Sequence, residues 1–321
     1  MVTETATITA AVDAPWQQLC RLPRRQGRRL SGSSMEKTFE SIPQIDFANM
    51  DVSLADRQAL AAQVNATFTE SGFLYSCSHS ISKALQKEVL GVMQAFFTLP
   101  AEEKVKFTST TRPRSRATSV CSKQNSARTP AATSRRSSTL ATTRPSPSKT
   151  ARPGLTCLPE QWHYAHQPVA CQPSNFRGVL YQYHAAVMSF LRQLLQIIAL
   201  ALDLEEDYFD ALTTFPMAGL RPLYYPPREL APDISIGAHA DYSWLTVVNQ
   251  LTDAPALEVL NANAHWVCAP PLPNTLVIND SDFLERATNS MFVLTFHRVV
   301  NKTAGVARYS LLFFSVPATT P

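Results

Sequence analysis

The chain has 321 residues, of which 45% are hydrophobic and 17% are charged. A chain of this length and composition buries a large core, which excludes a disulfide-stapled mini-protein and a chain that is disordered throughout. The six cysteines lie far apart and form no Cys-x-x-Cys pair, so we expect reduced thiols and a cytoplasmic protein. The longest apolar stretch, residues 187–202, is interrupted by polar side chains and is too short to span a bilayer.

The net charge of +4 comes from one part of the chain. Residues 104–156 contain twelve Lys and Arg residues and no Asp or Glu. Without that segment, 17 basic residues stand against 25 acidic ones, so the rest of the chain is acidic. A nucleic-acid or membrane partner could be inferred from the net positive charge, but that inference would depend on this segment alone. We therefore expect no nucleic-acid partner and no membrane partner.

The N-terminal part of the chain is predicted to begin with a flexible extension, residues 1–40, which has no sustained hydrophobic period. Residues 41–107 then form a region that combines strands and helices. Its expected elements are a strand at residues 42–47, a helix at residues 53–71 capped near Asp51 or Leu54, an apolar run at residues 72–79 and a helix at residues 82–100 that Pro100 ends.

Residues 108–158 change character abruptly. Ser, Thr, Arg, Ala and Pro dominate and aromatic residues are absent, so the segment cannot bury enough apolar surface to offset its ordering entropy. One interpretation is a long disordered loop that binds an acidic partner. The other is an aberrant stretch, from a misassigned intron or a shifted reading frame. We favour the second, because structureless loops of this length are uncommon inside compact domains.

The C-terminal half is predicted to join a helical support region, residues 159–215, to a β-rich domain, residues 216–317. The support region contains a helix at residues 185–202 with an apolar stripe. The short apolar runs that follow predict an α+β or mainly β fold class, with a double-stranded β-helix (jelly roll, cupin-like) core flanked by N-terminal and central helices. The expected strands are LRPLYYPP, WLTVVNQL, LEVL, HWVCAP, TLVIND, FVLTFHRVV and RYSLLFF.

Three residues of the β-rich domain suit a metal centre. His239 and Asp241 are two positions apart, so on an extended segment both side chains point to the same face. His297 follows 56 residues after Asp241 and could return on a neighbouring strand. Two imidazoles and one carboxylate around a metal with open positions suit non-haem Fe(II) oxygen chemistry. The alternative is a hydrogen-bonded sheet histidine beside a turn aspartate, because an isolated His-x-Asp pair arises often by chance.

An anion-binding pair follows the histidine along the chain. Arg308 lies eleven residues after His297, and Ser310 lies on the same face of the strand as Arg308. Together they supply a guanidinium fork and a hydroxyl group for a carboxylate. Burying an arginine without an acidic partner raises the free energy of the folded state, and a bound anionic cosubstrate would supply the missing partner.

These motifs occur in an order that resembles a known family, the iron- and 2-oxoglutarate-dependent dioxygenases that are similar to isopenicillin N synthase. The resemblance covers residues 42–107 and residues 176–317. It is carried by GFLYSCSH and FFTLPAEEK, then by LRPLYYPP, GAHADYSWLTVV, TLVINDSDFLERATN, HRVVN and RYSLLFF.

The resemblance implies the role of each candidate residue. His239, Asp241 and His297 would bind Fe(II), and Arg308 and Ser310 would bind the distal carboxylate of 2-oxoglutarate. Tyr225 matches a tyrosine that contacts a bound carboxylate in relatives, although a tyrosine that only packs in its strand is an equal alternative. Arg298 is expected to support its own strand, and the other histidines are expected to be structural or exposed.

The resemblance also implies the reaction. Fe(II), 2-oxoglutarate and O2 would together oxidise a C–H bond of a small organic molecule by hydroxylation, desaturation or ring formation, with a role in secondary metabolism. We expect a monomer. The candidates for an apolar substrate wall are Leu223, Trp244, Val247 and Phe314, and for each of them a place in the core is the more frequent role. Two alternatives stay open: an iron-dependent oxidase that does not use 2-oxoglutarate, and a catalytically impaired relative or binding protein with a disordered basic loop.

The sequence departs from the family where relatives usually have glycine. Glycine at such sites permits a positive φ, which costs other residues on the order of 1 kcal/mol each. The residues that replace it are Ser80, Ala256, Asn274, Ser281 and Ser290.

Overall fold

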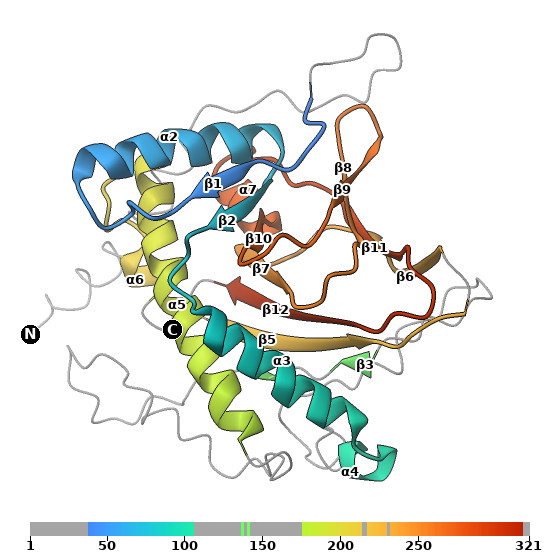
Figure 1. The fold of residues 1–321 in the computed structure, drawn as a ribbon. Coiled ribbons are helices and arrows are strands. Elements are labelled where there is room, and N and C mark those ends of the chain that lie inside the picture. Colours follow the sequence, from blue (N-terminus) through green and yellow to red (C-terminus); the bar gives the residue numbers. More distant parts are fainter. Residues whose placement is uncertain are drawn as a thin grey trace, which may run out of the picture.

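A computed structural model describes residues 38–105, 136–137, 140–141, 175–213, 217–229 and 232–316. Its helices pack on one face of a large β-sheet, and a smaller sheet covers part of the other face (Figure 1). The predicted flexible extension, residues 1–40, lies almost entirely outside the described residues. Most of the basic segment, residues 108–158, also lies outside them.

The two helices that lie between residues 53 and 99 each pair an N-terminal serine cap with an apolar face. Ser53 Oγ accepts a hydrogen bond from the backbone N–H of Asp56 at 3.1 Å, and Ser82 Oγ accepts one from that of Leu85 at 3.2 Å. Both helices that were predicted before residue 100 are confirmed, and Ser53 rather than Asp51 or Leu54 is the first cap. The described helices are α2 (Leu54–Glu70), α3 (Lys83–Thr98), α4 (Ala101–Val105), α5 (Phe176–Ala201), α6 (Asp210–Thr213) and α7 (Asp282–Ala287).

Helix α5 begins nine residues before the predicted 185–202 helix and ends one residue before it. Its first turns bury Phe176, Val179, Leu180 and Tyr183, and this helical spacing went unnoticed because polar residues separate the four positions. By length and composition alone α5 could cross a membrane, but 61% of its most apolar window is buried inside the protein. It packs against α2 and α3 and contributes much of the main core.

Two sheets form the β-rich part. The larger sheet has the strand order β1-β2-β10-β7-β12-β5-β3, with β4 also paired to β5, and the smaller sheet has the order β6-β11-β8-β9. The β1–β2 pair is parallel and the other described pairs are antiparallel. The strands are β1 (Gln44–Asp46), β2 (Phe73–Cys77), β3 (Arg136–Ser137), β4 (Leu140–Ala141), β5 (Met217–Tyr225), β6 (Asp233–His239), β7 (Leu245–Gln250), β8 (Leu257–Leu260), β9 (Trp266–Ala269), β10 (Leu276–Asp280), β11 (His297–Asn301) and β12 (Arg308–Val316).

The larger sheet has two differently packed faces because side chains alternate along each strand. On β12, Leu311 and Phe313 are fully buried in the main core with the helices. The opposite face of the same sheet packs on the smaller sheet, where Phe73 and Val277 meet Val259 in a second apolar cluster. Two facing sheets with helices on the outside confirm the predicted jelly-roll core.

Three features of the β-rich part differ from the sequence-based expectation. The predicted strand FVLTFHRVV is wrong in its first half, because β11 begins only at His297. Helix α7 and strand β6 were not predicted. The basic segment contributes β3 and β4, which pair with β5 through Arg136 and Tyr224 and through Leu140 and Leu220.

The expected positive φ angles occur at two of the five positions without glycine. Asn274 has φ of 56° and Ser290 has φ of 63°, whereas Ser281 is extended with φ of −141°. Ser80 and Ala256 also have ordinary φ values. A similar angle of 60° occurs at Ala264, in a turn where Asn261 Oδ1 accepts hydrogen bonds from the backbone N–H groups of Asn263 and His265.

Candidate metal centre and anion site

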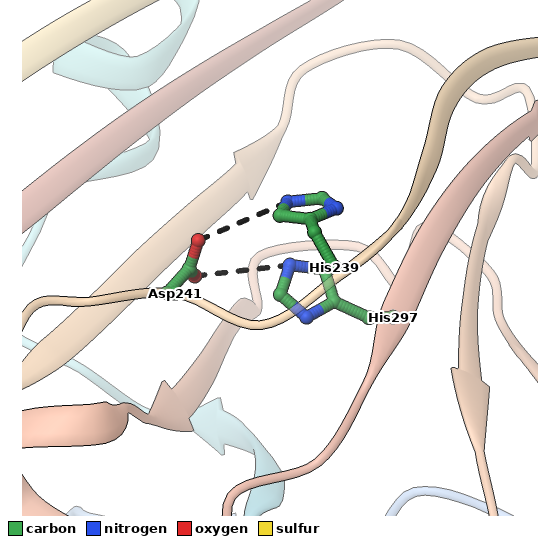
Figure 2. A group of neighbouring side chains, drawn as sticks. All are labelled: His239, Asp241 and His297. Carbon is green, nitrogen blue, oxygen red and sulfur yellow. Dashed lines mark ion pairs between the residues drawn. The ribbon is translucent and has the colours of Figure 1, made fainter.

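The structure brings His239, Asp241 and His297 together. His239 is the last residue of β6 and His297 is the first of β11, and the two lie opposite each other in the register of these antiparallel strands. Asp241 lies in the loop that follows β6, not on a continued strand as its spacing from His239 had suggested. One ligand atom from each residue lies within 4.8 Å of the others, and the carboxylate points toward both imidazoles (Figure 2).

The two histidines present the same ring nitrogen to the carboxylate. His239 Nε2 lies 3.9 Å from Asp241 Oδ1, and His297 Nε2 lies 3.7 Å from Asp241 Oδ2. On the other side of each ring, Nδ1 faces a backbone carbonyl, that of Gly237 at 2.9 Å and that of Thr295 at 3.5 Å. Because a carbonyl only accepts, Nδ1 carries the proton and the Nε2 lone pair is available to a metal.

Burial keeps His297 in the neutral form that a metal requires. Its side chain is enclosed by the protein, and the ring of Phe73 packs edge-on at a centroid distance of 5.3 Å. Burial lowers the pKa of His297, and the neighbouring His239 lowers it further, while Asp241 and the carbonyl of Thr295 act in the opposite direction. A neutral imidazole binds metal without first releasing a proton.

Arg308 and Ser310 lie on the face of β12 that is turned toward the smaller sheet. Their neighbours Leu311 and Phe313 face the helices, so alternation places Arg308 and Ser310 on the other side. Both are buried, with exposed fractions of 4% and 7%. The predicted pair therefore lies on the inner face of the larger sheet, which packs against the smaller sheet that carries the two histidines.

The guanidinium of Arg308 is buried with an incomplete set of partners. Its Cζ lies 4.1 Å from the ring centroid of Tyr225, the residue opposite it on β5. Among the residues that the structure describes, Nε and Nη2 have no hydrogen-bond acceptor, and no carboxylate forms an ion pair with Arg308. Burial lowers its pKa, although Tyr225 opposes this effect. A buried cation with free donors fits a carboxylate ligand.

The predicted substrate wall divides into two groups. Trp244 and Val247 are core residues, as the more frequent role had suggested: both are buried in the main core on the helical side, where Trp244 packs edge-on against Phe209 at 5.1 Å. Leu223 and Phe314 lie on the inner face with Arg308, by the same alternation along β5 and β12.

Sequence reasoning missed two residues next to Asp241. Tyr242 is 67% exposed, and its ring lies parallel to that of Phe314 at an interplanar angle of 6° and a centroid distance of 6.5 Å. Asn279 donates a hydrogen bond from Nδ2 to Asp241 Oδ2 at 3.1 Å. Tyr242 could have been found from its position beside a candidate ligand, whereas no local signal connects Asn279 to Asp241.

Other polar groups stabilise strands away from the centre. Arg298 Nε lies 2.7 Å from Glu258 Oε2, and its guanidinium covers the ring of Trp266 at 4.0 Å. The expectation that Arg298 supports its own strand is confirmed. His79 and His184 are buried apart from the three-residue cluster.

The arrangement fits iron and 2-oxoglutarate. Two imidazole nitrogens and one carboxylate leave positions open on a six-coordinate ion, and this donor set is typical of non-haem Fe(II) oxygenases. The buried Arg308 donors fit the distal carboxylate of the cosubstrate.

Two family models match the chain. The model of the 2OG-Fe(II) oxygenase superfamily matches residues 218–317, the part that carries all the candidate residues. The model described as the N-terminal region of non-haem dioxygenases in morphine synthesis matches residues 42–164, a range that includes the basic segment.

Similar proteins agree with these matches. A homoarginine-6-hydroxylase from Oryza sativa is 32% identical over 87% of this chain and 87% of its own length. A 2-oxoglutarate-Fe(II) type oxidoreductase from Metarhizium majus is 29% identical over 96% of this chain and 87% of its own length.

Solved structures give the same result. A 2OG-Fe(II) oxygenase family protein from Caulobacter crescentus superposes with a TM-score of 0.73 at 26% identity, covering 87% of this chain and 88% of that one. The Neurospora crassa T7H complex with alpha-KG shares the fold, with a TM-score of 0.70 at 22% identity over 89% of each chain. The chain therefore belongs to the 2OG-Fe(II) oxygenase superfamily, as an oxidoreductase that uses Fe(II), 2-oxoglutarate and O2.

Proposed function

We propose that His239, Asp241 and His297 bind the ferrous ion, and that Arg308 binds the distal carboxylate of 2-oxoglutarate with help from Ser310. The observation that carries this assignment is the convergence of three ligand atoms within 4.8 Å at the end of β6 and the start of β11, together with a buried arginine on the inner face of the larger sheet. The reaction class is the oxidation of a C–H bond in a small organic molecule.

The side chains place the reactants and keep water away from them. When iron and 2-oxoglutarate are bound, oxidative decarboxylation of 2-oxoglutarate supplies the oxidising power for the C–H bond. His297 and Asp241 are buried, so their lone pairs are held in fixed directions. Tyr225 covers the guanidinium of Arg308 and orients its free donors. Phe73 closes the apolar side of the His297 ring.

We further propose that the substrate is apolar and planar where it contacts the protein. Tyr242 follows Asp241 directly, yet 67% of it is exposed, and Phe314 lies parallel to it on the inner face of β12. Exposed aromatic rings beside a reactive centre become buried when a ligand covers them, and parallel ring faces favour a flat partner.

The charge-transfer band of ferrous iron with 2-oxoglutarate tests the metal assignment. We expect this band when the purified protein is mixed with Fe(II) and 2-oxoglutarate without oxygen, and we expect His297→Ala to abolish it. The matched control is His184→Ala, which removes a buried histidine outside the cluster and should retain the band. A normal band in His297→Ala would remove this residue from the ligand set, and a wild-type protein without the band would be a catalytically impaired relative.

A turnover assay tests the cosubstrate and the substrate class. Succinate formation that depends on 2-oxoglutarate separates a dioxygenase from an iron-dependent oxidase. We expect planar aromatic compounds to stimulate succinate formation more than homoarginine, the compound named for the rice relative. Tyr242→Ala should weaken this stimulation, with a rise in apparent KM of up to about tenfold. Preferential stimulation by homoarginine would contradict the planar substrate.

We propose a role in secondary metabolism for a cytoplasmic monomer. The description of the N-terminal family model, which refers to morphine synthesis, supports the metabolic role. The free thiols of Cys77 and Cys268 support a reducing compartment. Light scattering of the purified protein measures the oligomeric state, and a dimer mass would overturn that part of the proposal.

A further inference from the structure

Asp241 lies in a loop and not on a strand. Hydrogen bonds from the segment that follows β10 fix this loop. The backbone N–H of Asp282 donates to the carbonyl of Asp241 at 3.0 Å, and that of Phe283 donates to the carbonyl of Ser243 at 3.3 Å. The hydroxyl of Ser281 also lies 3.1 Å from that of Ser243. The start of helix α7 thereby fixes the loop that carries the carboxylate.

Asn279 adds a contact to the carboxylate itself. It lies on β10, is 1% exposed, and donates from Nδ2 to Asp241 Oδ2 at 3.1 Å. The same Nδ2 donates to the backbone carbonyl of Asp280, also at 3.1 Å. Both partners are acceptors, so the amide can face them only with its NH2 group.

The position of Asn279 in the sheet connects it to the other ligands. Its register partner on β2 is Phe73, whose ring packs against His297 at a centroid distance of 5.3 Å. Asn279 and Phe73 are therefore neighbours on the inner face of the larger sheet. Asn279 contacts Asp241 and Phe73 contacts His297, so each supports one of the three candidate ligands. Both are essentially inaccessible to solvent, which limits movement of the groups they touch.

We infer that Asn279 is a positioning residue that makes Asp241 a one-oxygen ligand. Its hydrogen bond occupies Oδ2 and leaves Oδ1 available for the metal. A carboxylate that bound through both oxygens would take an additional coordination position, which 2-oxoglutarate and O2 require. This inference rests on the proposed iron site. It concerns the affinity and the geometry with which Asp241 binds the metal. Hydrogen bonds that support a metal ligand in this way typically change metal affinity 10–100-fold.

Mn(II) binding to the apoprotein tests the inference without turnover. Asn279→Leu keeps the branched shape and the number of side-chain heavy atoms and removes the donor, and we expect it to weaken Mn(II) binding about tenfold or more by calorimetric titration. The ferrous 2-oxoglutarate charge-transfer band should also shift or weaken. The matched control is Asn249→Leu, because Asn249 is a buried asparagine of the same sheet that donates instead to Gln86 and Tyr183.

The control separates positioning from folding. Both Leu variants should lower the melting temperature of the apoprotein, but Asn249→Leu should leave Mn(II) affinity within about twofold of the wild type. If Asn279→Leu does not fold, Asn279→Ala serves for the same titration. Unchanged Mn(II) affinity in the Asn279 variants, or an equal loss in Asn249→Leu, would overturn the inference. If His297→Ala binds Mn(II) as well as the wild type does, the proposed iron site itself fails.

Discussion

Arg308 and Tyr225 face each other across β12 and β5, with the guanidinium 4.1 Å from the centre of the tyrosine ring. The ring covers one face of a buried cation whose Nε and Nη2 have no acceptor among the described residues. Stacking of this kind compensates only part of the cost of burying a guanidinium. The remaining donors of Arg308 are therefore available to a carboxylate ligand.

Arg308→Lys should raise the KM for 2-oxoglutarate tenfold or more, because a lysine ammonium cannot form two parallel hydrogen bonds to a carboxylate or stack on Tyr225 in the same way. Succinate formation at varied 2-oxoglutarate concentrations measures this effect. Arg298→Lys is the control, because that side chain pairs with Glu258 away from the centre. An unchanged KM in Arg308→Lys would assign the arginine another role.

His184 should make the protein less stable in acid. Burial, with a smaller contribution from Arg192, lowers the pKa of His184 from the ordinary 6.5 to about 4. The unfolded chain therefore binds the proton first, so the stability due to neutral His184 is complete above pH 6.5 and declines as the pH falls toward 4. The decline amounts to about 3 kcal/mol in all, at about 1.4 kcal/mol per pH unit.

Urea unfolding between pH 7 and pH 4 measures this decline. His184→Gln should flatten the pH dependence, whereas His265→Gln should leave it unchanged because His265 is exposed. Identical pH profiles for the wild type and His184→Gln would show that His184 does not cause the acid sensitivity.

Asp280 should have the opposite pH dependence. It is 1% exposed, both carboxylate oxygens have no hydrogen-bond partner among the described residues, and burial raises its pKa well above the usual value, with a smaller contribution from Glu285. The folded protein therefore releases this proton at a higher pH than the unfolded chain does, so the contribution to stability is present below about pH 4 and is lost as the pH rises through the raised pKa of the folded state. Asp280→Asn cannot ionise and should melt a few degrees higher than the wild type at pH 7.

Calorimetry at pH 7 and at pH 4 tests this expectation. The advantage of Asp280→Asn should shrink at pH 4, where about half of the Asp280 carboxyl groups are protonated in the unfolded chain as well. Asp282→Asn is the control, because Asp282 pairs with Arg286 at the surface. An advantage of Asp280→Asn that persists at pH 4 would have a cause other than ionisation.

Ser290→Gly should stabilise the protein by about 1 kcal/mol, because φ at this position is 63°, a conformation that glycine adopts without strain. The backbone N–H of Ser290 donates to the carbonyl of Glu285 at the end of α7, and glycine retains this bond. Ala256→Gly should instead lower the free energy of unfolding by about 1 kcal/mol, since Ala256 is fully buried and has an ordinary φ. Equal effects of the two changes, measured by urea unfolding, would contradict the conformational argument.

The sequence alone determined the residue types at the centre and the strands β11 and β12, which carry His297, Arg308 and Ser310, but not strand β6, which ends at His239. The spacing of His297, Arg308 and Ser310 within short apolar runs was enough, because alternation along a strand is a local property. Helices α2 and α3 were equally predictable, since the apolar positions of each recur at helical spacing within one segment.

Only the tertiary structure decided which face of each strand is the inner one. Strand β7 is buried on nearly every residue, so its sequence could not show that Val247 faces the helices while Phe314 of the neighbouring strand faces the smaller sheet. The contact between Asn279 and Asp241 joins residues 38 positions apart. Such contacts depend on how two sheets are stacked, and no periodicity within a single strand encodes that stacking.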